Sequence, residues 1–355
     1  MCIAFPVILY IMPLILKQKQ INLQSMKAHW FPVLLLMAVG IVIAHDNIAA
    51  YKNRKYQEAR INTLFPSEAA DTMWRGWGKY QILTKTDNGR LIWYGRELIA
   101  NTAHYLGPKG VVAQVTNGMN CQNCHLDAGT LPYGNNFGKV YSTYPKFRAR
   151  NNGIQTIYDR INDCLERSLN GKKMNSSTHE MQAIYAYIKW LGDGIPKGVE
   201  KGGTSLMKLL YLDRAASPDN GRLIYTANCQ SCHGANGNGQ ANNDASGYIY
   251  PPLWGEHSYN DGAGLYRISS FAGFVKNNMP LGADYHHTTL SDEAAWDVAA
   301  FVNSQPRPHK DQSADWHDLA QKPVDFPFGP YADHFSEQQH KFGPFKPIKD
   351  VQKTK

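Results

Sequence analysis

Two segments carry the clearest periodic pattern of apolar and polar residues along this chain. In the segment HEMQAIYAYIKWLGD, which begins at His179, apolar residues recur at positions i, i+3, i+4 and i+7 and share one helical face: Ile184, Tyr187, Ile188 and Leu191. The segment SDEAAWDVAAFVNSQ begins at Ser291, and a Ser followed by Asp and Glu is typical of a helix start. Gly192 and Gly194 are expected to end the first helix. We therefore predict two aromatic helices in corresponding positions of two domains.

A short internal repeat supports this division. The pentapeptide NGRLI occurs at Asn88–Ile92 and again at Asn220–Ile224, and each copy runs into an amphipathic stretch. The repeated order predicts a mainly α fold with two helical domains, at residues 45–195 and 213–305, joined by a linker at 196–212 that follows a Gly-rich stretch. Residues 306–355 are rich in proline, which disfavours helix, so we expect an extended tail over the surface.

The N-terminal residues 1–44 are apolar in two separate runs. A Met at position 26 precedes Lys27 and an apolar stretch from Phe31 to Ala44 that ends in Val-x-Ala, which is typical of a secretory signal. We expect cleavage after Ala44, with the first 25 residues as an upstream extension, and a periplasmic protein. The alternative is an uncleaved membrane anchor, although the stretch is shorter than the roughly 20 residues of a spanning helix.

Composition and net charge limit the chemical classes of partner that this protein is expected to bind. The hydrophobic content of 43% and the charged content of 19% are ordinary for a globular protein, while the net charge of +8 favours anionic partners. Nucleic acid is not expected, because no basic run is interleaved with stacking aromatic residues. A small inorganic anion or an acidic redox protein fits the charge.

Four cysteines form two copies of the motif C-x-x-C-H: Cys121, Cys124 and His125, then Cys229, Cys232 and His233. This motif is the attachment site of c-type haem, in which the two thiols bind the porphyrin and the His binds the iron. A zinc site or a redox dithiol uses C-x-x-C without the adjacent His. Two covalently bound haem c groups are therefore predicted, one in each domain, each wrapped by a cytochrome c-type fold.

A second axial ligand is expected well after each motif. In the second domain Met279 stands before Pro280 in KNNMPLG, where a thioether ligand would raise the reduction potential. Lys276, Asn278 and His257 are the alternatives.

The first domain has no such Met-Pro loop, and its possible ligands form a mixed set: Met174, Met181, His104, His179 and Cys164. Cys164 follows a helical pattern with Ile157, Ile161, Leu165 and Ser168. Arg160 precedes it by one helical turn, and Arg148 and Arg150 lie upstream. Cations beside a thiol favour the thiolate, which is the better nucleophile and metal ligand. A buried free Cys that only fills space remains the alternative.

The segments YPKFRARNNGIQTIYDR and RINDCLERSLNG, together with the two haem motifs, resemble the dihaem thiosulfate dehydrogenase family over roughly residues 70 to 305. The resemblance implies that His125 and Cys164 bind the first haem, and that Arg150, Arg160 and Ser168 line the substrate pocket around the cysteine. It implies a second, electron-transfer haem bound by His and by Lys or Met. Asn278 stands where some members carry Lys, which favours ligation by His233 and Met279.

The resemblance also implies the reaction. Two thiosulfate ions would be joined to tetrathionate, and electrons would pass from haem 1 to haem 2 and then to an external acceptor such as a small cytochrome c. We expect Cys164 to bind iron at rest and then to form a sulfur–sulfur bond with the first thiosulfate. Two alternatives stay open: the same site working as a tetrathionate reductase, and a dihaem electron carrier without a substrate.

Overall fold

Helices provide most of the regular structure in the part of the chain that this computed structural model describes, namely Trp74, Gly76, Ile82, Thr86, residues 88–244 and residues 246–353. The expected signal peptide or anchor at residues 1–44 lies outside the described residues. Within them, no helix has the length and apolar character needed to cross a membrane. The fold is mainly α, as predicted, and two small antiparallel hairpins are the sheets found in the described ranges.

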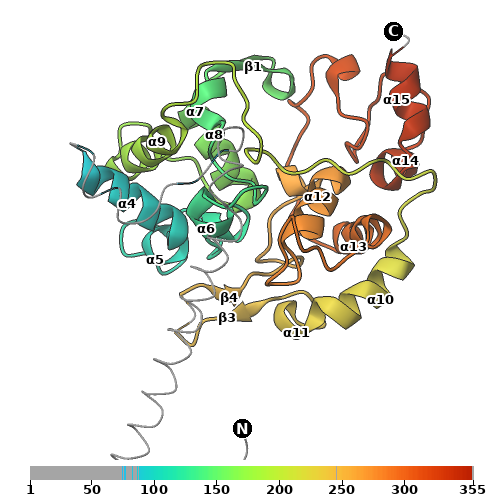
Figure 1. Cartoon of the computed structure of the whole chain (residues 1–355), viewed down its shortest axis with the longest axis horizontal. Helices are drawn as coiled ribbons and strands as arrows, with labels where there is room; N and C mark the ends of the chain where they lie inside the picture. Colours follow the sequence, from blue (N-terminus) through green and yellow to red (C-terminus); the bar gives the residue numbers. More distant parts are fainter. Residues whose placement is uncertain are drawn as a thin grey trace, which may run out of the picture. The chain divides into compact units, whose positions relative to one another are not determined.

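The first haem module runs from α4 (Gly89–Ala100) to α9 (His179–Gly192), which are its two long helices. Between them the chain forms a series of short elements: α5 (Thr102–Leu106), η1 (Cys121–Asn123), α6 (Leu126–Gly129), α7 (Val140–Thr143), β1 (Lys146–Arg148), η2 (Ala149–Asn151), β2 (Gly153–Gln155), α8 (Ile157–Asp163) and η3 (Cys164–Ser168). Figure 1 shows α4 and α9 beside each other. The crossing is close because Gly95 lies against the Ala183 carbonyl, where a Cβ would stand 2.0 Å from the oxygen.

The predicted closing helices are confirmed. The face of α9 that the sequence marks as apolar is buried in the first core, at Ile184, Tyr187, Ile188 and Leu191. In the second module, the Ser291 side chain caps α13 (Asp292–Ser304) by accepting a hydrogen bond from the Ala294 backbone N–H at 3.1 Å.

The second haem module repeats the arrangement of the first. Its remaining elements are α10 (Pro218–Asn228), α11 (Gln230–His233), β3 (Gln240–Ala241), β4 (Tyr248–Tyr250), η4 (Gly264–Tyr266) and α12 (Ile268–Asn278). Helices α10 and α13 pack together as α4 and α9 do, and again a glycine permits the approach. A Cβ on Gly221 would stand 1.9 Å from the Asp297 carbonyl oxygen. The repeat in the sequence therefore corresponds to a repeated helix pair.

The C-terminal segment differs in part from the expected extended tail. It runs from Gln305 with only one short helical turn, η5 (Leu319–Gln321), but then forms α14 (Glu337–Phe342) and α15 (Lys346–Lys353). The expectation of extended chain is wrong for these two helices. Pro347 lies in the first turn of α15, where its missing N–H costs no helical hydrogen bond. The helices are fixed because Phe342, Phe345 and Ile348 are buried in the second core.

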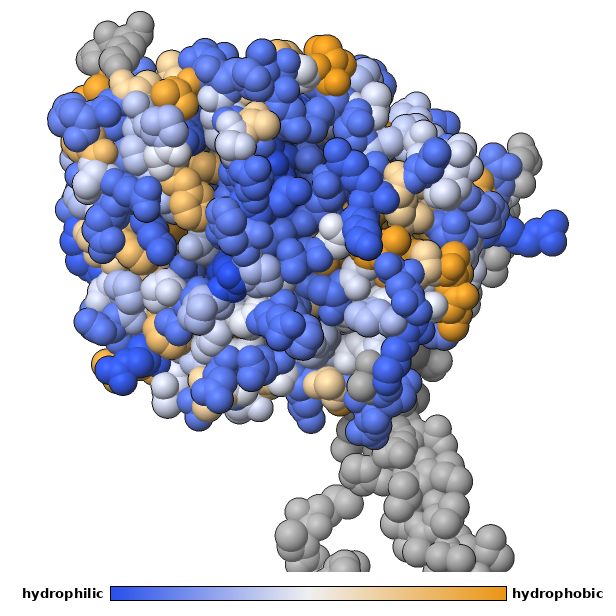
Figure 2. Space-filling view, turned by 180° about the vertical axis from the view of Figure 1, so that it is seen from behind, coloured by the Kyte–Doolittle hydropathy of each residue, from blue (hydrophilic) through white to orange (hydrophobic). Residues whose placement is uncertain are grey.

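On the face shown in Figure 2, hydrophilic residues predominate, and apolar residues occur in small separate groups. The interior cores of the two modules thus account for most of the large apolar side chains in the described ranges.

Candidate active site

The first C-x-x-C-H motif presents its histidine in the state that binds a metal. His125 Nδ1 faces the Asn135 carbonyl oxygen at hydrogen-bond distance. Because a carbonyl can only accept, Nδ1 must carry the hydrogen, which leaves Nε2 free to bind iron. Burial, with a smaller contribution from Arg160, lowers the pKa of His125 to about 4, so the imidazole is neutral near pH 7.

A cavity of about 1070 Å³ lies beside this histidine. Its wall includes Cys121 of the motif and a set of apolar side chains: Ile99, Leu106, Phe137, Ile157, Ile161, Leu165, Ile184 and Ile188. Pockets for large organic ligands have this size and this apolar character. The cavity, the thiol and the neutral imidazole fit a covalently attached haem.

The second motif has the same design. His233 Nδ1 donates to the Pro251 carbonyl at 2.8 Å, and burial lowers the pKa of His233. Met279 follows α12 directly and packs against the second core. The alternative ligands are engaged elsewhere or exposed. Lys276 Nζ bonds the Leu290 carbonyl at 2.6 Å, Asn278 Nδ2 bonds the Phe274 carbonyl at 2.8 Å, and His257 is exposed.

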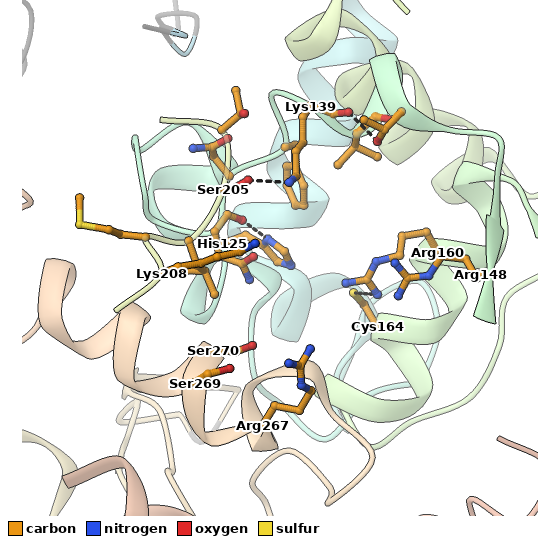
Figure 3. Close-up of a pocket in the computed structure, with 18 of the residues that line it drawn as sticks. His125, Lys139, Arg148, Arg160, Cys164, Ser205, Lys208, Arg267, Ser269 and Ser270 are labelled. Carbon is orange, nitrogen blue, oxygen red and sulfur yellow. Dashed lines mark hydrogen bonds between the residues drawn. The ribbon is translucent and has the colours of Figure 1, made fainter. Parts of the chain in front are cut away.

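Cys164 lines the first cavity together with His125, and Figure 3 shows the two side chains in the same pocket. It begins η3, a π-helical turn in which the Leu169 N–H donates to the Cys164 carbonyl at 3.0 Å. The sequence pattern predicted that the α-helix continues through Cys164, whereas the structure has a π-helical turn there. Such turns occur often at functional sites.

The other possible ligands in the first module lie outside the residues that line this cavity. Met181 is fully buried in the core within α9, and Met174 packs at the edge of that core. His104 and His179 are exposed. Among the candidates for the second axial position, Cys164 is the one that the described structure brings to the cavity.

Arg160 contacts the Cys164 sulfur directly. Its guanidinium donates to Sγ at 3.1 Å, and Cys164 is the main cause that raises the pKa of Arg160. The two residues stand one helical turn apart, at the junction of α8 and η3, as the spacing in the sequence predicted.

A second, smaller cavity of about 230 Å³ also reaches Cys164 and His125. Its polar lining brings together the three residues that the resemblance assigned to the substrate, Arg150, Arg160 and Ser168. Arg150 is not free, however, because its guanidinium pairs with the buried Asp163 carboxylate. Burial lowers the pKa of Arg150, and Asp163 opposes that effect.

The sequence identified Arg148 only as a cation upstream of Cys164, and it did not indicate two further residues that line this cavity, Arg267 and Trp316. Figure 3 shows the side chains of Arg148 and Arg267 near Cys164. Arg267 precedes α12 in the second module, and its Nε donates to Asp325 at 2.9 Å. Trp316 belongs to the C-terminal tail. Because Arg267 and Trp316 are far from Cys164 in the sequence, no local spacing could indicate them.

The two modules, each with a haem motif and a neutral histidine, define the protein as a c-type cytochrome with two covalently bound haems. Residues 112–196 match the family model described as SoxA/TsdA, cytochrome c domain, and residues 218–306 match the cytochrome c model.

Known thiosulfate dehydrogenases are similar to this chain. Thiosulfate dehydrogenase from Allochromatium vinosum is 39% identical over 62% of this chain and 79% of its own length. Thiosulfate dehydrogenase from Psychrobacter arcticus is 40% identical over 57% of this chain, and the match spans 61% of that relative. The solved thiosulfate dehydrogenase (TsdBA) from Marichromatium purpuratum superposes with a TM-score of 0.61 at 28% identity, over 68% of this chain and 51% of that one. The chain belongs to the thiosulfate dehydrogenase family.

Proposed function

We propose that this protein oxidises two thiosulfate ions to tetrathionate at the cavity beside Cys164. The observation that carries the proposal is the contact between Arg160 and the Cys164 sulfur, in a cavity that arginine side chains line from several sides. An electron carrier has no need of a cysteine within a cluster of guanidinium groups. The names of the relatives support the same substrate.

Repulsion is the main physical obstacle to this reaction. Two unit charges about 4 Å apart interact by about 1 kcal/mol in water, so two dianions repel by roughly 4 kcal/mol, and more where water is excluded. Arg160 would offset this repulsion and orient sulfonate oxygens through its planar array of donors. Arg150 would add donors at the same cavity, although Asp163 already compensates its charge. The Ser168 hydroxyl adds a further donor at the same cavity.

The chemistry divides into two steps with Cys164 as the reacting group. In the first, a sulfur–sulfur bond forms between the Cys164 thiolate and the outer sulfur of one thiosulfate, and two electrons leave. In the second, the outer sulfur of another thiosulfate attacks the sulfur attached to Cys164. Tetrathionate departs, and the Cys164 thiolate is restored. Atoms and charge balance when an electron acceptor other than the cysteine takes up the two electrons.

The residues that would hold the two haems are His125 and Cys164 for the first, and His233 and Met279 for the second. The haems supply one-electron acceptors that relay the two electrons to an external redox protein, such as a small cytochrome c. The covalent haem sites and the N-terminal apolar segment support an exported, periplasmic location, where the thiols lie outside a reducing cytosol.

Steady-state assays of the purified dihaem protein in both directions test the proposal. We expect thiosulfate to reduce ferricyanide with formation of one tetrathionate for every two electrons. The reverse assay, with tetrathionate and a reduced donor, measures whether the same site works as a reductase. A protein that carries both haems but turns over neither sulfur compound would be an electron carrier, and the proposal would be wrong.

A further inference from the structure

The smaller cavity contains more anion-binding groups than one thiosulfate requires. Arg160 of α8 bonds the Cys164 sulfur and Ser168 of η3 lines the same cavity, so both suit the ion that reacts with the cysteine first. Arg150 on the same side is already compensated by Asp163. Two other residues of the lining, Arg148 and Trp316, have no role in that account.

Arg148 ends strand β1, and its backbone pairs with Gly153 in β2. Its side chain is half-buried and lines both cavities, yet it makes no hydrogen bond or ion pair with any residue of the described ranges. The other arginines at the small cavity differ, since Arg150 and Arg267 pair with aspartates and Arg160 bonds the Cys164 sulfur. A cation held at a cavity wall without a counter-charge is suited to an anionic ligand.

Trp316 presents a second unsatisfied donor at the same cavity. Its indole Nε1 is buried and finds no acceptor among the described residues. The residue adopts φ of +63°, a conformation that is uncommon for a large side chain and that persists only when its surroundings impose it.

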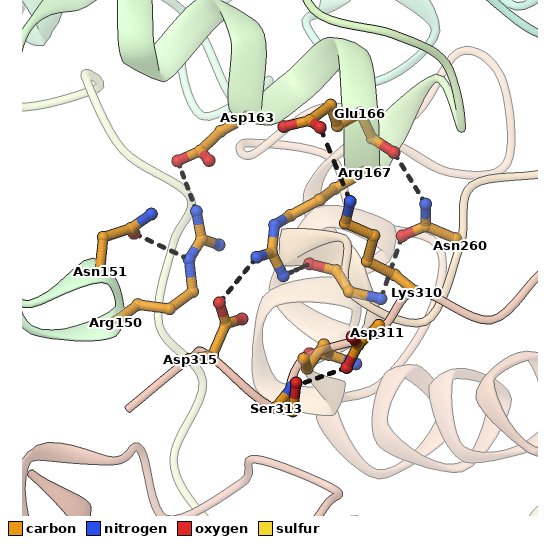
Figure 4. Close-up of polar contacts among 12 residues, drawn as sticks. Arg150, Asn151, Asp163, Glu166, Arg167, Asn260, Lys310, Asp311, Ser313 and Asp315 are labelled. Carbon is orange, nitrogen blue, oxygen red and sulfur yellow. Dashed lines mark hydrogen bonds and ion pairs between the residues drawn. The ribbon is translucent and has the colours of Figure 1, made fainter. Parts of the chain in front are cut away.

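Two contacts next to the ring impose this conformation. The Trp316 backbone N–H donates to the Arg150 carbonyl at 2.8 Å, and the preceding Asp315 pairs with Arg167 of η3 at 2.9 Å. Figure 4 shows the Arg167–Asp315 pair that joins the tail to this helix. The tail is therefore attached to the first module at the point where the indole lines the cavity.

From these observations we infer that Arg148 and the Trp316 indole N–H form a second sulfonate subsite, which binds the thiosulfate that attacks Cys164 after the first has bonded to it. The inference rests on the proposed function and assigns different residues to the first and to the second thiosulfate. In the reverse direction the same pair binds the sulfonate of tetrathionate that leaves first. Both residues touch substrate, so their loss should slow the second step and spare the first.

Trp316→Phe removes the N–H and keeps a ring against Phe326, which the indole contacts edge-on at 5.3 Å between centroids. Arg148→Gln removes the charge. Because each donor would bond a charged group, we expect kcat/KM for thiosulfate to fall roughly tenfold or more in each variant. In stopped-flow mixing, thiosulfate should still reduce the haems at the wild-type rate. The adduct on Cys164 should accumulate, as measured by intact mass.

Matched controls are Trp296→Phe, which removes an indole N–H bonded to the Leu210 carbonyl in the second core, and Arg90→Gln on the exposed face of α4. Neither should change kcat/KM. Unchanged kinetics in both Trp316→Phe and Arg148→Gln, with an active wild type, would overturn this inference and leave the proposed function intact. Altered haem content or an altered haem 1 spectrum, at unchanged kcat/KM, would assign the two residues to the haem instead. An inactive wild type would overturn the proposed function itself.

Discussion

The contact between Arg160 and Cys164 is the central interaction at the scale of single residues. The guanidinium donates to the sulfur at 3.1 Å, inside a cavity that also holds the neutral His125. Because a guanidinium cannot lose its proton near neutral pH, it is a permanent source of positive charge beside the sulfur. A substrate anion that approaches the sulfur therefore meets a cation at the same point.

Replacing Arg160 should damage turnover without unfolding the haem sites. In Arg160→Gln we expect kcat/KM for thiosulfate to fall roughly tenfold to a hundredfold, because a charge-assisted hydrogen bond to the substrate is lost. Steady-state kinetics measure the loss, and the haem 2 absorption spectrum should not change. Arg90→Gln on exposed α4 is the control. Wild-type kinetics in Arg160→Gln would show that the guanidinium does not bind substrate.

At the scale of elements, the π-helical turn η3 is a feature that the apolar pattern of the sequence did not predict. The apolar spacing before Cys164 predicted a helix, and α8 confirms it. The π turn that begins at Cys164 also contacts a distant part of the chain, where Asn260 of the second module donates to the Glu166 carbonyl at 2.8 Å. Contacts of this kind carry no local signal.

The other parts of the site also divide into features that the local sequence predicts and features that depend on distant residues. The haem motifs, the helix faces and the Arg160–Cys164 spacing depend on neighbours in the sequence, and the sequence predicted them. The ion pair that compensates Arg150 depends on Asp163 at the end of α8, and Trp316 comes from the tail. The tail helices were missed because proline was counted against them, while the burial of Phe342, Phe345 and Ile348 was not foreseen.

The tail also contains an ion pair whose pH dependence can be measured. Asp325 is fully buried and accepts from Arg267 and Ser269. Burial alone raises the pKa of Asp325, but Arg267 and Ser269 outweigh it and hold that pKa below the ordinary value of 3.8. The pair thus contributes its full stability above pH 3.8 and loses it as pH falls through the lower, folded-state value.

In Asp325→Asn, the free energy of unfolding near pH 7 should fall by about 2–3 kcal/mol, because Arg267 loses its counter-charge but stays partly solvated. The difference from the wild type should shrink as the pH falls below 3.8, as measured by denaturant unfolding of the holoprotein at several pH values. A difference that stays constant down to acid pH would contradict the assignment.

At the scale of the whole molecule, the two modules and the tail meet beside Cys164. Arg167 of η3 pairs with Asp315 of the tail at 2.9 Å, and both side chains are more than nine-tenths buried. Asn260 binds the Glu166 carbonyl and the Asn170 side chain from the second module. Figure 4 shows the Arg167–Asp315 and Asn260–Glu166 contacts side by side. The small cavity is therefore built from all three parts of the chain.

This arrangement predicts that stability and substrate binding are linked at Arg167. In Asp315→Asn we expect the free energy of unfolding to fall by about 3 kcal/mol, because a buried guanidinium is left without its partner, and the KM for thiosulfate to rise. Arg214→Ala is the control, since it breaks the ion pair with Asp297 at 2.7 Å within the second module. The control should leave KM unchanged. An equal KM in both variants would show that the tail ion pair does not affect thiosulfate binding.

The central claim is that the Cys164 sulfur carries the reaction. The most direct test is thiosulfate oxidation by Cys164→Ala, purified with both haems attached and assayed with ferricyanide beside the wild type. We predict that both haems remain covalently bound and that tetrathionate formation is abolished. Tetrathionate formation at the wild-type rate by this variant would contradict the account.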